Sequence, residues 1–117
     1  MGRTVVIVDD HAGFRTSARL LLEDEGYEVL GEAADGRSGI AAVRELRPAI
    51  VLLDIRLPDI DGIAVAIELT RNGDAPAIVL TSSHDREDFG DSIEASGASG
   101  FVPKGELCGA AVAAAVA

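Results

Sequence analysis

The sequence predicts an α/β fold in which a parallel sheet of five strands lies between two layers of helices. Short runs of β-branched and other apolar residues alternate with stretches in which apolar residues recur at helical spacing. This alternation is typical of right-handed crossovers between parallel strands. A chain of 117 residues can bury one core of this kind but not two, so we expect one domain over residues 1–117.

The first half of the chain contains two predicted strand–helix units. Residues 5–8 form an uninterrupted apolar run, as expected for a strand covered on both faces. Residues 15–25 show helical spacing and are followed by Gly26, which favours a helix end. A weaker strand over 28–32 follows, and a second helix over 38–46 ends before a proline.

The second half of the chain repeats the pattern three times. A helix opens at Asp61-Gly62 and ends at Asn72-Gly73, and a later one is stopped by Gly97. The last helix is rich in alanine. The predicted strands here are 50–53, 77–80 and 99–102, and the other two predicted helices are 86–96 and 106–117.

Charge and cysteine content restrict the class of protein. Lys and Arg number 10 against 20 for Asp and Glu, which gives a net charge of -10. So acidic a surface disfavours direct contact with nucleic acids or anionic membranes, and it favours cations and basic protein surfaces. The single cysteine, Cys108, fits a reducing compartment, and no apolar run approaches the ~20 residues of a membrane span. We therefore expect a cytoplasmic protein.

Polar side chains follow the predicted strands at the points where these end. In an open α/β sheet, ligands bind beyond the carboxyl ends of the strands, where the strand order reverses. A flavodoxin-like order 2-1-3-4-5 would make the first and third strands neighbours, and it would gather these side chains at one rim. They are Asp9, Asp10, Asp54, Thr81, Ser82 and Lys104.

Three carboxylates at one rim predict a cation site. Two like charges ~4 Å apart repel by about 4 kcal/mol at an effective dielectric constant near 20. The ligands are hard oxygens, which favours Mg²⁺ over zinc. A divalent ion and the ammonium of Lys104, the only lysine in the chain, would neutralise the three acids. Beside them, Asp54 could attack a phosphoryl group as a nucleophile, because it ends a central strand between the other groups.

Four segments carry a resemblance to a known family. They are Val8-Asp9-Asp10-His11, Leu53-Asp54 with the following Leu57-Pro58-Asp59-Ile60-Asp61-Gly62, Leu80-Thr81-Ser82, and Gly97-Ala98-Ser99-Gly100-Phe101-Val102-Pro103-Lys104. Together they resemble the receiver domain of two-component response regulators, over almost the whole chain. The first and last segments look most like receivers that are joined to helix-turn-helix DNA-binding domains.

The resemblance implies a phosphorylation site that contains Mg²⁺. Asp54 would accept a phosphoryl group from a histidine kinase or a phosphotransfer protein. Asp10 would bind Mg²⁺ directly, Asp9 directly or through water, and the backbone carbonyl of Arg56 would be a further ligand. Such a domain would be no metabolic enzyme, since it catalyses only its own phosphoryl transfer and autodephosphorylation.

The resemblance also implies a conformational switch. A hydroxyl turns toward the phosphoryl group, Lys104 pairs with it, and Phe101 swings inward behind the hydroxyl. Counting forward from Pro76 makes Thr81 this hydroxyl, whereas counting back from Lys104 makes it Ser82; we prefer Thr81. The fourth helix, fifth strand and fifth helix would then shift, and this face would serve for output, which is expected to be transcriptional, or for homodimerisation.

Two other functions compete with this interpretation. A receiver-like adaptor would bind partners without being phosphorylated, although every position that the chemistry needs is filled. A Mg²⁺-dependent phosphohydrolase would often carry Asp-x-Asp at the nucleophile, but Arg56 occupies the second position. For two other residues we expect structural roles: His11 as a surface or capping residue, and Cys108 as a small core residue.

Overall fold

The computed structural model describes residues 3–71, 73–84 and 86–117. Its sheet has five strands in the order β2-β1-β3-β4-β5, and every neighbouring pair is parallel. The predicted fold class and strand order are therefore confirmed. The strands are β1 (Thr4–Val8), β2 (Glu28–Ala33), β3 (Ile50–Asp54), β4 (Ala77–Ser82) and β5 (Gly100–Pro103).

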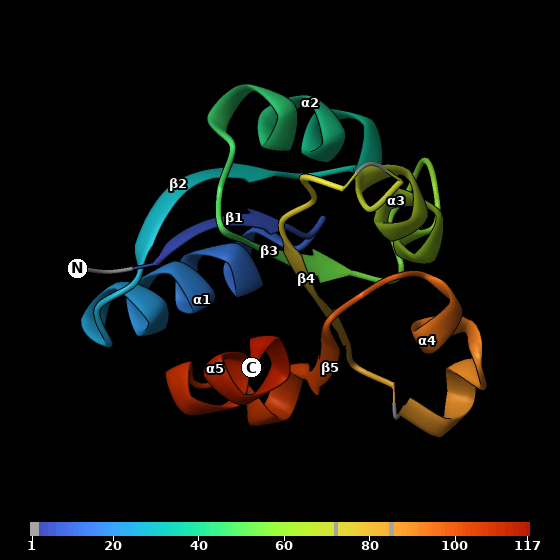
Figure 1. Ribbon diagram of the computed structural model, residues 1–117. Helices are drawn as coiled ribbons and strands as arrows, with labels where there is room; N and C mark the ends of the chain where they lie inside the picture. The colour runs from blue at the N-terminus through green and yellow to red at the C-terminus, as the bar shows by residue number, and fades with distance from the viewer. Residues whose placement is uncertain (1–2, 72, 85) are drawn as a thin grey trace.

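Helices cover both faces of the sheet (Figure 1). Side chains alternate between the two faces along a strand. On β1, Val5 and Ile7 therefore pack into the core beneath α1 and α5, whereas Val6 and Val8 pack beneath α2, α3 and α4. The helical segments are α1 (Ala12–Asp24), α2 (Gly36–Leu46), α3 (Gly62–Leu69), η1 (Arg86–Phe89), α4 (Ser92–Ala95), η2 (Lys104–Glu106) and α5 (Gly109–Val116).

The first two helices begin earlier than predicted, and the third begins at Asp61-Gly62 as predicted. α1 begins three residues before the predicted start, directly after His11, which has an extended backbone. Asp35 caps α2 by accepting a hydrogen bond from the Ser38 amide at 2.8 Å. Asp61 caps α3 in the same way, through the Ile63 amide at 2.7 Å. α3 ends at Leu69, and the predicted end at Asn72 lies outside the described residues.

The prediction of a continuous helix over 86–96 is wrong. The segment forms the short 3-10 helix η1 and the single turn α4. Gly90 lies between them with φ +56°, a left-handed conformation that an α-helix cannot include. Gly90 itself was the signal in the sequence, because it lies in the middle of the predicted helix.

The predicted last helix also begins later than expected. Cys108 has φ -158° and ψ 166°, so it lies just outside α5, and its Sγ accepts a hydrogen bond from the Ala111 amide at 3.3 Å. The residue is half-buried and caps the helix, so its prediction as a core residue is wrong. None of the helices among the described residues has the length and apolarity needed to cross a membrane.

Candidate functional site at the carboxyl edge of the sheet

Two buried aspartates lie side by side where β1 and β3 end. Asp9 follows β1 and is fully buried, and Asp54 ends β3 with 3% of its surface exposed. The Asp9 amide donates to the Ala33 carbonyl, and the Ile55 amide donates to the Thr81 carbonyl, both at 3.0 Å. Sheet hydrogen bonding therefore continues into the loops and fixes the backbone at both acids.

The structure brings the predicted acidic trio together. One carboxylate oxygen each from Asp9, Asp10 and Asp54 and one ring nitrogen of His11 all lie within 4.8 Å of one another. The side chain of Asp10 is 35% exposed, so the cluster opens to solvent on this side. The cluster therefore combines two buried acids with one that solvent reaches.

His11 joins this cluster, which the sequence analysis did not predict. It occupies the N-cap position of α1, but its side chain makes no capping hydrogen bond. Instead its Nδ1 lies 3.1 Å from both Asp9 Oδ1 and Asp10 Oδ1. Its place next to two acids in the sequence was the only available signal.

Lys104 enters the cluster from the other side. Its Nζ lies 2.7 Å from Asp9 Oδ2 and 3.4 Å from Asp54 Oδ2, and its side chain is 16% exposed. The contact with Asp9 is an ion pair without hydrogen-bond alignment, because Asp9 Oδ2 has no hydrogen-bond partner among the described residues. Three carboxylates and one ammonium leave two negative charges uncompensated when His11 is neutral.

Burial is the main influence on the Asp54 carboxyl. It raises the pKa of Asp54, and the nearby Asp9 carboxylate raises it further. Lys104 and the Arg56 amide, which donates to Asp54 Oδ1 at 3.2 Å, act in the opposite direction without cancelling the effect. A divalent cation would relieve this excess negative charge. The hard oxygen donors of three clustered carboxylates and two uncompensated charges together fit Mg²⁺.

The two candidate hydroxyls differ in their hydrogen bonding. Thr81 pairs with Asp54 in the register of β3 and β4, and its Oγ1 is buried without a partner among the described residues. Ser82 is buried as well, but its Oγ accepts a hydrogen bond from the His84 amide at 3.0 Å. Thr81 is thus the hydroxyl with unused hydrogen-bonding capacity beside Asp54.

Close packing fixes the segment that follows Asp54. Gly62 donates its amide to the Ile55 carbonyl at 2.7 Å. A Cβ at Gly62 would lie 2.7 Å from Ile55 Cα and would overlap the carbonyl oxygen of Asp54. A glycine is therefore required here for close backbone approach. The exposed Arg56 lies within this constrained loop.

Asp59 fastens the same loop to α2, a contact that the sequence analysis missed. Its two carboxylate oxygens accept the amides of Gly36 at 2.7 Å and Arg37 at 2.9 Å. Desolvation acts to raise the pKa of Asp59, but these backbone hydrogen bonds outweigh it, and the net pKa is lowered. A carboxylate at a helix N-terminus is also favoured by the helix dipole.

Phe101 lies on β5, one strand beyond the hydroxyls. It is half-buried against the core beneath α2, α3 and α4, and it pairs with Leu80 in the sheet register. Its ring centroid is 6.0 Å from that of Phe89, at an interplanar angle of 53°.

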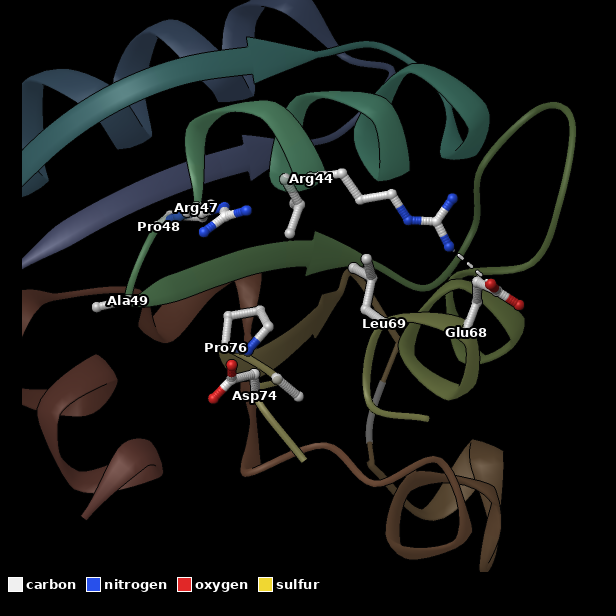
Figure 2. A pocket seen from close by; sticks show the side chains of 10 residues that line it. Arg44, Arg47, Pro48, Ala49, Glu68, Leu69, Asp74 and Pro76 are labelled. Atoms are coloured by element: carbon white, nitrogen blue, oxygen red, sulfur yellow. Dashed lines mark hydrogen bonds and ion pairs between the residues drawn. The ribbon is translucent and has the colours of Figure 1, made fainter. Parts of the chain in front are cut away.

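A separate hollow lies at the opposite end of the sheet, where the loops enter β3 and β4 (Figure 2). It measures about 640 Å³ and is lined by α2 and α3 residues that include an Arg44–Glu68 ion pair of 2.7 Å. None of the predicted site residues is among its described lining residues.

Comparisons with known proteins agree with this geometry. A family model described as the response regulator receiver domain matches residues 5–112. BvgA of Bordetella pertussis, named for positive transcription regulation of virulence factors, is 38% identical over 106 residues, or 91% of this chain and 51% of that protein. A protein-glutamate methylesterase/protein-glutamine glutaminase of Alkalilimnicola ehrlichii is 39% identical over 103 residues, or 85% of this chain and 26% of that protein.

A solved structure agrees over nearly the whole length. The signal receiver domain of NarL from Mycobacterium tuberculosis superposes with a TM-score of 0.85 at 31% identity, covering 97% of this chain and 96% of that chain. The curated relatives are longer, since this chain spans about half of BvgA and about a quarter of the methylesterase.

Proposed function

Since the chain belongs to the response regulator receiver family, we propose that it is a signalling switch whose phosphorylation site is Asp54. The observation that carries this proposal is the surroundings of the Asp54 carboxylate. It is 3% exposed, clusters with Asp9 and Asp10, and has the Lys104 ammonium 3.4 Å away. With a divalent cation on the three acids, the cation and Lys104 would together stabilise negative charge on a transferred phosphoryl group.

The proposed donor is a phosphohistidine on a histidine kinase or a phosphotransfer protein. An Asp54 carboxylate oxygen attacks the phosphorus and forms an O–P bond, while the P–N bond breaks and its electron pair returns to the imidazole nitrogen. Lys104 then pairs with a phosphoryl oxygen. When held by Asp9, Asp10, Asp54 and the Arg56 carbonyl, Mg²⁺ supplies charge neutralisation. Autodephosphorylation by water regenerates the carboxylate, and no other reaction is assigned to the domain.

We assign the switch hydroxyl to Thr81. Phosphorylation adds roughly one negative charge and new acceptor oxygens at Asp54, and these give the orphaned Thr81 hydroxyl a partner. As Thr81 turns toward the site, Phe101 moves inward behind it. The face formed by α4, β5 and α5 then changes, and it becomes the surface for output or for homodimerisation.

The proposed output is control of transcription. BvgA supports this, and so does the likeness to receivers that precede DNA-binding domains. With a net charge of -10, the receiver itself is a poor DNA ligand, so an attached output domain would make that contact. A role between a histidine kinase and transcription belongs in the cytoplasm.

Phosphorylation by a small phosphodonor such as acetyl phosphate tests the proposal. We expect Mg²⁺-dependent incorporation of one phosphoryl group per chain, measured by intact mass. Asp54→Asn should abolish it, whereas the matched control Asp24→Asn, an exposed acid at the end of α1, should be labelled like the unmodified protein. Equal labelling of Asp54→Asn would contradict the assignment. Absence of both labelling and Mg²⁺ binding would favour a phosphorylation-independent adaptor.

A further inference from the structure

The ammonium of Lys104 also contacts an aromatic ring. The Nζ lies 4.6 Å from the centroid of the Phe14 ring. Phe14 is in the first turn of α1, where it is half-buried and packs against the core beneath α1 and α5. The ammonium therefore contacts two carboxylates and the face of a ring.

We propose that Phe14 is a positioning residue for Lys104. A lysine carries its charge on four flexible methylenes, so holding its ammonium in one place costs conformational entropy. The negative face of an aromatic ring attracts a cation within about 6 Å. Because the Lys104 side chain is only 16% exposed, little solvent weakens this attraction.

The ring differs from the other two contacts of Lys104 in one respect. Asp9 and Asp54 are the proposed ligands of Mg²⁺, and Asp54 is the proposed phosphoryl acceptor, so both change partners during the reaction. The ring of Phe14 binds neither Mg²⁺ nor the phosphoryl group. It can keep the ammonium at the rim while the carboxylates are engaged elsewhere. This part of the inference rests on the proposed function.

Phe14 could instead serve packing alone, and two substitutions separate these roles. Phe14→Tyr keeps the ring face, whereas Phe14→Leu keeps an apolar side chain without one. A cation–π contact at a site of this burial corresponds to about a 2- to 30-fold effect. We expect Phe14→Leu to slow Mg²⁺-dependent labelling by acetyl phosphate within this range, and Phe14→Tyr to restore the rate.

A spectroscopic readout is independent of phosphorylation. Lys104 is the only lysine, so protein labelled with ¹³C-lysine gives one set of side-chain signals. Protons above a ring face resonate upfield. We expect upfield Lys104 Hε signals in the unmodified protein and in Phe14→Tyr, and ordinary positions in Phe14→Leu. Unchanged positions in Phe14→Leu would overturn the inference.

A double-mutant cycle in unfolding completes the test. Phe14→Leu should lower the folding equilibrium constant both in the unmodified protein and in Lys104→Met. The decrease should be about 2- to 30-fold smaller in Lys104→Met, because the cation–π contact is already absent there. Additive effects would reduce the ring to packing and overturn the inference. If the unmodified protein is not labelled at all, the proposed function fails, whereas the Lys104 signals and the cycle still decide the role of Phe14.

Discussion

Replacing Lys104 with methionine removes the ammonium while keeping much of the apolar stem, and it leaves Asp9 and Asp54 buried without a cation. The Nζ lies 2.7 Å from Asp9 Oδ2 and 3.4 Å from Asp54 Oδ2. At an effective dielectric constant near 20, each attraction is about 5–6 kcal/mol before desolvation is subtracted. Removing one partner of a buried pair typically costs about 3–5 kcal/mol. Because Lys104 retains some solvent contact, we expect a loss near 3 kcal/mol.

Urea unfolding without divalent ions measures this loss. Arg44→Met is the control, because the Arg44–Glu68 ion pair is also 2.7 Å long but has side chains 63% and 36% exposed. Its loss should stay below about 1 kcal/mol. A Lys104→Met effect no larger than that of Arg44→Met would refute the electrostatic account of the site.

The pH dependence of the Lys104→Met loss has a definite sign. The pKa of Asp54 is raised in the folded protein, so its contribution to stability is present at low pH and is lost as the pH rises through that pKa. Without the ammonium of Lys104, burial and the Asp9 carboxylate raise the pKa of Asp54 further. The gap between Lys104→Met and the unmodified protein should therefore widen with rising pH and narrow in acid.

Five further variants test the site and its surroundings through stability. Asp54→Asn without divalent ions should stabilise the fold at neutral pH, by about 1 kcal/mol, because burial and the Asp9 carboxylate disfavour the charged Asp54 more than Lys104 and the Arg56 amide favour it. This advantage should vanish in unfolding curves recorded below pH 3.8, the ordinary pKa. Gly62→Ala should lower the free energy of unfolding by about 1–3 kcal/mol, because the added Cβ overlaps the backbone. Gly13→Ala is the control, because a Cβ there meets nothing within 4 Å, and it should raise the free energy of unfolding by about 0.5–1 kcal/mol. Thr81→Val should raise the midpoint of thermal unfolding, because it removes a buried hydroxyl that has no hydrogen-bond partner. Ser82→Ala should lower the free energy of unfolding by about 1 kcal/mol, because it removes a hydrogen bond. If the two variants showed the opposite signs, the switch hydroxyl would be assigned to Ser82 instead.

The sheet was predictable from sequence because its strands are buried on both faces. Residues 5–8 and 50–53 are uninterrupted apolar runs, and short apolar runs that alternate with helical patterns are typical of central parallel strands. The juxtaposition of Asp9 and Asp54 followed from strand order, since neighbouring parallel strands end at the same rim.

Contacts that depend on local backbone geometry were not predictable in this way. Gly90 interrupts the fourth helix through a left-handed conformation, but a glycine inside a helical pattern does not by itself decide whether the helix ends there. The hydrogen bond from the Gly36 amide to the Asp59 carboxylate joins residues more than twenty positions apart. The ring of Phe14 contacts Lys104 from another helix. Such contacts depend on how the loops fold over the rim, which residue patterns within one segment do not record.

The most direct test of the central claim is chemical mapping of the phosphorylated residue. Protein treated with Mg²⁺ and acetyl phosphate is reduced with borohydride, which converts an aspartyl phosphate to homoserine, and its peptides are sequenced by mass spectrometry. We predict homoserine at position 54 alone, and only when Mg²⁺ is present. Homoserine at another aspartate, or equal conversion after Mg²⁺ is chelated, would contradict the account.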